Sequence, residues 1–218
     1  MFTLDAHSKL TEYLNTHELS RGVGTKESAC SIAAINLALT GELTDRIPGC
    51  MSEVIGRWVI TVQDAMPAEI RNSTRWKTLL PQAAGTGRSK ESERIAVILD
   101  WMWCTTLPSL QQIADKYGFG GTWGEMCELK TPAAARAAAD AARTTARAAR
   151  AADAADAADA AADAARAARA AAAARAAADA ARAARAAADA ARAAADAARA
   201  AAWEKFDPCA VLEKLIEA

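Results

Sequence analysis

Apolar residues recur three and four positions apart through residues 1–131, and no alternating pattern persists over five residues. The first spacing places apolar side chains on one face of an α-helix, whereas alternation would indicate a strand. Glycine and proline interrupt the pattern and divide it into segments. The predicted helices are Leu4–Leu19, one capped by Thr25 or Ser28 that ends at Gly41, one from Pro48 to Pro67, Trp76–Leu80, one capped by Ser89 with a kink or restart at Pro108, Ser109–Tyr117 and one from Thr122.

Residues 133–202 form a tract of 49 Ala, 11 Arg, 8 Asp and 2 Thr. Thr131 and Pro132 precede it, and this pair is typical of a helix start, with threonine as the N-cap and proline in the first helical position. No further glycine or proline occurs before Pro208. Because alanine has the highest helix propensity, the tract is predicted to be helical.

The charged residues of the tract do not stay on one face of a helix. Steps of four and three between Arg136 and Arg150 keep them within a stripe of about 80°, whereas repeated steps of three up to Asp159 turn the stripe about halfway round. The tract is therefore either one rod whose segments pack against different neighbours, or it breaks near residues 151–156 and 170–174 and folds back.

The charges also fall into blocks of opposite sign. Residues 136–150 carry +3, residues 153–163 carry −4, residues 166–175 carry +3 and residues 179–199 carry +1. Opposite blocks favour antiparallel pairing, within one chain or between two, and alanine side chains would allow the backbones to approach closely. The alternative is a solvated helix whose charges only provide solubility.

The C-terminal residues return to an ordinary amphipathic pattern. Trp203 and Phe206 end the tract, and a last helix starting at Asp207–Pro208 has Val211, Leu212, Leu215 and Ile216 on one face. So short a helix is not stable alone, so we expect it to dock on the N-terminal domain or on another subunit. The sequence thus predicts an all-α protein: a compact multi-helix domain (1–131), an alanine-rich helix or folded-back helical hairpin (132–202) and a short C-terminal amphipathic helix (203–218).

Net charge and cysteine content narrow the function. The chain carries −1 overall, with +3 in the tract and −4 elsewhere, so neither part has the excess of Lys and Arg typical of nucleic-acid binding. Charges within the tract argue against a membrane span, and the N-terminus lacks a signal-peptide pattern. Five cysteines without C-x-x-C spacing, and His7 and His17 as the only histidines, argue against a zinc site. We expect a soluble, cytoplasmic protein with no metal and no cofactor.

Two glycine loops are the best candidates for a ligand site. Each combines a Gly-x-Gly turn with a basic residue ahead of a predicted helix, whose N-terminal N–H groups attract anions. Neither has P-loop spacing, so simple helix-connecting turns are the alternative. The candidate residues for a small anionic ligand or nucleotide are Gly22, Gly24, Thr25 and Lys26 in the first loop, and Thr86, Gly87 and Arg88 in the Gly85–Gly87 loop. No serine, histidine and aspartate are grouped for catalysis, so no enzymatic activity is expected.

The alanine tract, with Arg or Asp at every third or fourth position, resembles in composition reading frames of high-GC phages and bacteria. The resemblance covers the tract alone and implies a phage or mobile-element accessory. We expect a non-enzymatic helical interaction protein that binds itself, as a homo-oligomer, or binds and inhibits a host protein. The alternatives are a virion or filament component that uses the tract as a rod, and a binder of a small anion or nucleotide at the glycine loops.

Overall fold

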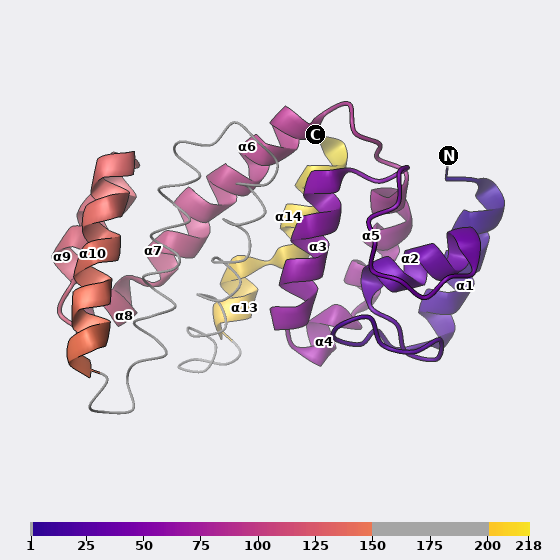
Figure 1. Cartoon of the computed structure of the whole chain (residues 1–218), viewed down its shortest axis with the longest axis horizontal. Helices are drawn as coiled ribbons and strands as arrows, with labels where there is room; N and C mark the ends of the chain where they lie inside the picture. The colour runs from indigo at the N-terminus through magenta and orange to yellow at the C-terminus, as the bar shows by residue number, and fades with distance from the viewer. Residues whose placement is uncertain (1, 150–200) are drawn as a thin grey trace. The chain divides into compact units, whose positions relative to one another are not determined.

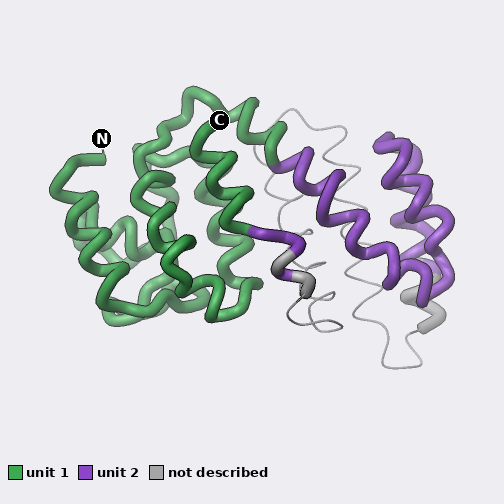
Figure 2. The backbone as a smooth tube through the Cα atoms, turned by 180° about the vertical axis from the view of Figure 1, so that it is seen from behind, with its two compact units in different colours: residues 1–97, 208–218 green, residues 98–207 purple. Residues whose placement is uncertain are grey.

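The computed structural model describes residues 2–149 and 201–218, and within these ranges the chain is helical (Figure 1). The predicted all-α class is confirmed. Extended pairing in the described ranges is limited to one isolated bridge between Gly24 and Ala29. Packing divides the chain into unit 1, residues 1–97 and 208–218, and unit 2, residues 98–207 (Figure 2). This division follows contacts, whereas the predicted division at residues 131 and 202 followed composition.

Unit 1 is built around two buried tryptophans. Its elements are α1 (Leu4–Thr16), α2 (Ser31–Thr40), α3 (Glu53–Ala65), α4 (Ala68–Arg71), α5 (Thr74–Ala84), the first part of α6 (Glu91–Trp101) and α14 (Pro208–Glu217). Trp58 of α3 and Trp76 of α5 are fully buried, with ring centroids 6.1 Å apart. The Trp76 indole donates to the Ser31 hydroxyl (3.1 Å), so its polar group is satisfied within the core.

The start of α2 differs from the prediction. Its N-cap is Cys30, whose Sγ accepts a hydrogen bond from the Ala33 amide (3.3 Å). Thr25 and Ser28, the predicted caps, instead close a turn in the preceding loop, where the Thr25 hydroxyl accepts from the Ser28 amide (3.2 Å). A hydroxyl engaged in its own turn cannot cap a helix that begins several residues later.

The start of α3 also lies further along the chain than predicted. Pro48 belongs to a turn, in which its carbonyl accepts from the Met51 amide (3.0 Å). Ser52 is the N-cap and accepts from the Ile55 amide (3.1 Å). Serine at this position satisfies one of the free amides of the first turn, so the helix begins at Glu53.

Helix α5 continues through Pro81, where the sequence predicted an end. Proline cannot donate to the carbonyl of Lys77, so the helix loses one hydrogen bond. Pro81 lies in the last turn, and it is buried together with Ala83 and Ala84. Burial of this turn outweighs the lost bond, and the helix ends only at the glycine that follows.

Unit 2 contains a π-helical turn just before Pro108. Its elements are the rest of α6, the π-helix Met102–Thr106, α7 (Leu107–Ser109), α8 (Gln111–Lys116), α9 (Gly120–Leu129), α10 (Pro132–Ala149) and α13 (Ala201–Phe206). The Leu107 amide donates to the Met102 carbonyl, five residues back. A π turn and a proline are both recognised causes of helix irregularity, and together they form the predicted break.

Helix α9 begins at Gly120 rather than at Thr122 as predicted. Trp123 lies in its first turn, is fully buried and donates from its indole to the Leu107 carbonyl (2.8 Å). Glycine in a helix costs about 1 kcal/mol relative to alanine. Burying a tryptophan contributes more than this, so the glycines are drawn into the helix.

The first part of the alanine tract packs as a helix against α9. Thr131 caps α10 as predicted, its hydroxyl accepting from the Ala134 amide (3.2 Å). Five alanines form the buried face of α10: Ala134, Ala135, Ala138, Ala139 and Ala142. Arg136 and Asp140, the first members of the charged stripe, are exposed. The remaining charge blocks, the breaks predicted near residues 151–156 and 170–174, and the choice between rod and hairpin lie outside the described residues.

The C-terminal helix α14 docks within the same chain on α3 and α5. Val211, Leu212 and Leu215 are buried and Ile216 is half-buried, in agreement with the predicted apolar face. Of the two predicted docking partners, the helix uses the N-terminal region of its own chain. Arg75 and Glu213 form a two-pronged ion pair beside it, with both N–O distances 2.9 Å.

Candidate functional site

The two glycine loops lie at opposite ends of α3. The Gly22 amide donates to Oδ1 of Asp64 near the C-terminal end of α3 (2.9 Å). The Gly87 amide donates to the Cys50 carbonyl, just before the N-terminal end (2.9 Å). The helix between these points rises 1.5 Å per residue, which separates the loops by about 18 Å. The loops therefore do not form one site.

In the first loop, the Thr25 hydroxyl forms hydrogen bonds within the loop. Thr25 Oγ1 accepts from the Glu27 amide (3.2 Å), and Lys26 is exposed. A hydrogen bond from the Thr25 side chain lowers the pKa of Glu27. The loop therefore keeps a carboxylate beside Lys26, which disfavours a phosphate. Because α2 begins only at Ser31, the loop does not open directly onto a helix N-terminus.

Gly24 is required by packing within this loop. Its φ is +75°, and a Cβ at this position would collide with Ser20 and Ser28. The positive φ and the close neighbours exclude most other side chains. Packing of the loop therefore explains this glycine, and no ligand is needed to explain it.

Next to the second loop, the first residue of α6 supplies a carboxylate to the N-terminus of α3. The Glu91 carboxylate accepts from the Ser52 hydroxyl (2.7 Å) and from the amides of Glu53 (2.8 Å) and Val54 (3.3 Å). These groups form the N-terminus of α3, so the carboxylate fills the anion position of the helix beside the loop. The helix that follows the loop in the chain is α6.

The basic residue of this loop is also paired. Arg88 lies 3.0 Å from the Glu53 carboxylate, and Thr86 accepts from the Ser52 amide (3.1 Å). The side chains of Thr86 and Arg88, two candidate ligand-binding residues of the second loop, are thus already bonded to other parts of unit 1.

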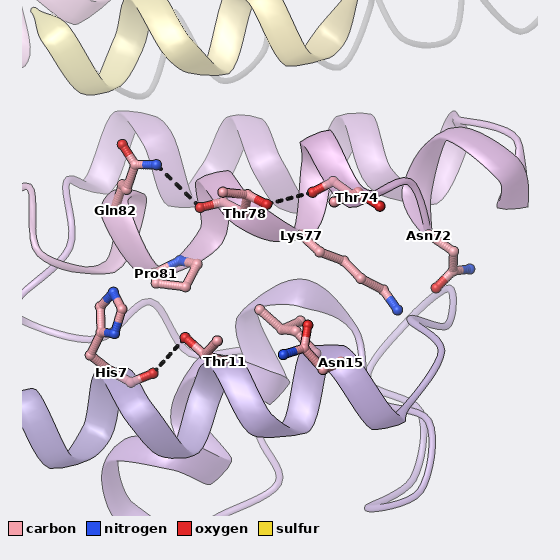
Figure 3. A pocket seen from close by; sticks show the side chains of 10 residues that line it. His7, Thr11, Asn15, Asn72, Thr74, Lys77, Thr78, Pro81 and Gln82 are labelled. Carbon is pink, nitrogen blue, oxygen red and sulfur yellow. Dashed lines mark hydrogen bonds between the residues drawn. The ribbon is translucent and has the colours of Figure 1, made fainter.

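A groove between α1 and α5 provides a second candidate site, with a volume of about 360 Å³ (Figure 3). Each helix contributes a polar side chain at every fourth position: His7, Thr11 and Asn15 from α1, and Thr74, Thr78 and Gln82 from α5. Leu14 and Pro81, both buried, supply its apolar surface. The two helices run antiparallel, so His7 lies opposite Pro81 and Gln82, and Thr11 opposite Thr78 (Figure 3).

Lys77 crosses the groove from α5 toward the end of α1. Its ammonium donates to the His17 carbonyl (2.8 Å), at the C-cap of α1. Asn72, at the same end, is held by the Leu19 backbone, whose amide donates to Asn72 Oδ1 (2.6 Å). The bond to His17 holds the ammonium of Lys77 at this end of the groove. Among the described residues, no aspartate or glutamate lines it.

Sequence reasoning missed this groove. The sequence shows that polar residues recur every four positions in each helix, and residues i and i+4 share a helix face. However, an exposed polar stripe is the normal outer face of any amphipathic helix. Only the packing of α1 beside α5 makes two such stripes face one another.

The remaining candidate chemistry is limited. The described residues contain no group of three or more His, Cys, Asp or Glu side chains that could hold a metal ion. His17 stacks on Tyr13 with ring centroids 4.3 Å apart, while His7 lines the groove. In the part of the chain that the structure describes, no helix is long and apolar enough to cross a membrane.

Comparison with known proteins gives no relatives: no family model, no curated protein and no solved structure matches the chain.

Proposed function

We propose that the protein is a non-enzymatic helical interaction protein whose alanine-rich tract pairs with a protein partner, a second copy of the chain included. The observation that supports this is the packing of α10 on α9. There, the alanine face of the tract is buried and Arg136 and Asp140 face outward. Alanine repeats with a charged stripe therefore serve as a helix-packing surface in this protein.

The rest of the tract has the composition of a similar helix-packing surface. Residues 150–200 contain Ala, Arg and Asp alone, in the charge blocks described above. Both flanking helices, α10 and α13, belong to unit 2. Trp203 and Phe206 of α13 are buried, and the Trp101 indole donates to the Phe206 carbonyl (3.0 Å). Both ends of the tract are thus anchored in one folded unit, which favours its presentation to a partner.

The tract resembles in composition reading frames of high-GC phages and bacteria. We take a host protein as the partner, which a phage accessory would inhibit. A virion or filament component is the alternative. As a single helix the tract would reach about 105 Å at 1.5 Å per residue. The placement of both α10 and α13 in unit 2 disfavours such a rod. The shape in solution separates these two possibilities.

Light scattering with small-angle X-ray scattering tests the proposal. Reversing the negative block, by changing Asp153, Asp156, Asp159 and Asp163 to Arg, should place like charges opposite one another. We expect a lower molecular mass if pairing is between chains, or a larger radius of gyration if it is within one chain. The effect should shrink in high salt, because charges at exposed positions are screened over about 10 Å at 0.1 M.

Two further variants control for general charge effects. Changing Arg143, Arg147 and Arg150 to Asp in the reversed variant restores complementarity and should restore the parent behaviour. Changing Asp179, Asp189 and Asp196 to Arg raises the charge of residues 179–199 from +1 to +7 but leaves the negative block intact. If pairing depends on that block, this variant should retain it. A reversed variant with the mass, radius and melting temperature of the parent would show that the tract is a solvated helix.

A further inference from the structure

We propose that the groove between α1 and α5 binds the free C-terminal carboxylate of a peptide segment. The groove is built from residues of unit 1 and the tract belongs to unit 2, so substitutions test the two proposals independently. Three features of the groove support the assignment: its charge, the direction of its hydrogen-bonding groups and its length.

The charge of the groove favours an anion. Lys77 supplies a formal positive charge, and none of the lining residues in the described part of the chain is acidic. One of the three ammonium hydrogens is used by the His17 carbonyl at 2.8 Å, which holds the side chain across the groove. The other two can donate to a carboxylate, and such charge-assisted hydrogen bonds are about twice as strong as neutral ones.

Asn15 adds a second donor at the same end. It is exposed, and its side-chain amide makes no hydrogen bond to any described part of the chain. Lys77 and Asn15 extend from the two facing helices (Figure 3). A carboxylate between them would accept from both.

The middle of the groove presents acceptors instead of donors. Thr11 Oγ1 donates to the His7 carbonyl (2.9 Å), and Thr78 Oγ1 donates to the Thr74 carbonyl (2.7 Å). Each hydroxyl hydrogen is therefore used by its own helix, and the oxygen lone pairs remain to accept. A ligand that fits needs a carboxylate at the Lys77 end and an N–H or O–H donor one helical turn away.

A peptide terminus has this order of groups. Asn15 and Thr11 are one turn apart, about 6 Å along α1. An extended peptide advances about 3.3–3.6 Å per residue, so its last two residues span the distance from carboxylate to backbone N–H donors. The buried side chains of Leu14 and Pro81 offer an apolar surface for a small side chain. The volume of about 360 Å³ is near the lower limit for ligand pockets, as suits so short a segment.

Nuclear magnetic resonance titration of the ¹⁵N-labelled full chain tests the proposal. The probes are N-acetyl-Ala-Ala with a free carboxylate, the same dipeptide with a C-terminal amide, and sodium acetate. We expect the free acid to shift the amide signals of residues 7–15 and 74–82 saturably. The amidated peptide should bind at least about tenfold more weakly, because it lacks the charge-assisted bonds.

Substitutions assign the binding to the groove. Lys77→Gln should weaken binding of the acid about tenfold or more, whereas Lys90→Gln, the same change at an exposed lysine outside the groove, should not. Because Lys77 also bonds to His17, the melting temperature of the variant is compared with that of the parent. Asn15→Asp removes no intramolecular hydrogen bond of the described chain and should weaken binding by charge repulsion.

Three results would overturn the assignment. The first is the absence of saturable shifts up to roughly 20 mM acid, well above a millimolar Kd. The second is equal binding of acid and amide, or unchanged binding in both groove variants. The third is acetate binding as tightly as the dipeptide, which would make a free carboxylate the ligand and remove the role of the peptide.

Discussion

Arg94 and Leu215 lie 121 positions apart in the sequence, and Nε of Arg94 donates a hydrogen bond to the Leu215 carbonyl at 3.1 Å. Leu215 is in the last turn of α14, where carbonyls have no partner within the helix. The other guanidinium nitrogens donate to the carbonyls of Gly87 (2.9 Å) and Thr86 (3.2 Å). One buried arginine thus joins the C-terminal helix to the second glycine loop.

Arg94→Met should destabilise unit 1 by about 2–4 kcal/mol, because it leaves buried carbonyls without a donor while retaining most of the side-chain volume. Denaturant unfolding followed by circular dichroism measures the change. Arg88→Met is the matched control, in the loop that Arg94 contacts. Arg88 is half-exposed and pairs with Glu53, so its loss should cost less than about 1 kcal/mol. Equal losses in the two variants would contradict the joining role of Arg94.

Ala138→Leu should destabilise unit 2 by about 1–3 kcal/mol, since Ala138 is fully buried on the face of α10 that packs on α9. Ala137→Leu introduces the same side chain on the exposed face, where alanine and leucine have similar helix propensity. It should change the free energy of unfolding by less than about 0.5 kcal/mol. Similar effects at both positions would mean that the alanine face is not a specific packing surface.

Cys127 should react slowly with thiol reagents at pH 8. Burial raises the pKa of its thiol to about 11, so little of the reactive thiolate is present until the pH approaches that value. Cys104 is exposed and should be labelled first. Mass spectrometry of peptides after timed iodoacetamide treatment gives both rates. Labelling of Cys127 as fast as that of Cys104 at pH 8 would contradict its burial.

The same pKa predicts a loss of stability in alkali. The folded state holds the Cys127 proton up to about pH 11, whereas the unfolded chain loses it near the ordinary value of 9.0. The stabilisation is complete below the ordinary pKa and is lost as the pH rises toward 11. Cys127→Ala should remove this part of the pH dependence, as measured by denaturant midpoints between pH 8 and 11. If stability falls with pH as steeply in Cys127→Ala as in the parent, groups other than Cys127 cause the loss.

The glycine loops should give no thermal shift with nucleotides or cyclic nucleotides, because Glu91 already occupies the N-terminus of α3 and Arg88 is paired with Glu53. A ligand at 100 times its Kd would stabilise the protein by about 2.7 kcal/mol, which differential scanning fluorimetry detects. A shift that disappears in the double variant Lys26→Ala, Arg88→Ala would instead establish an anion site there.

Local chemistry determined much of this protein from its sequence. Helical spacing without alternation specified the all-α class, and the pair Thr131–Pro132 specified the start of α10. The apolar face of α14 required a docking partner, because a short isolated helix is unstable. These features depend on neighbouring residues alone, so they can be read from the order of the chain.

The tertiary structure decided the features that depend on distant residues. Burial of its last turn carries α5 through Pro81, and burial of Trp123 draws Gly120 into α9, each against local preference. The Glu91 carboxylate fills the anion position at the start of α3 from 39 residues away. The groove requires α1 and α5 side by side, where Lys77 reaches a carbonyl 60 residues distant. Spacing along a chain specifies which residues share a helix face, but only packing determines which faces meet.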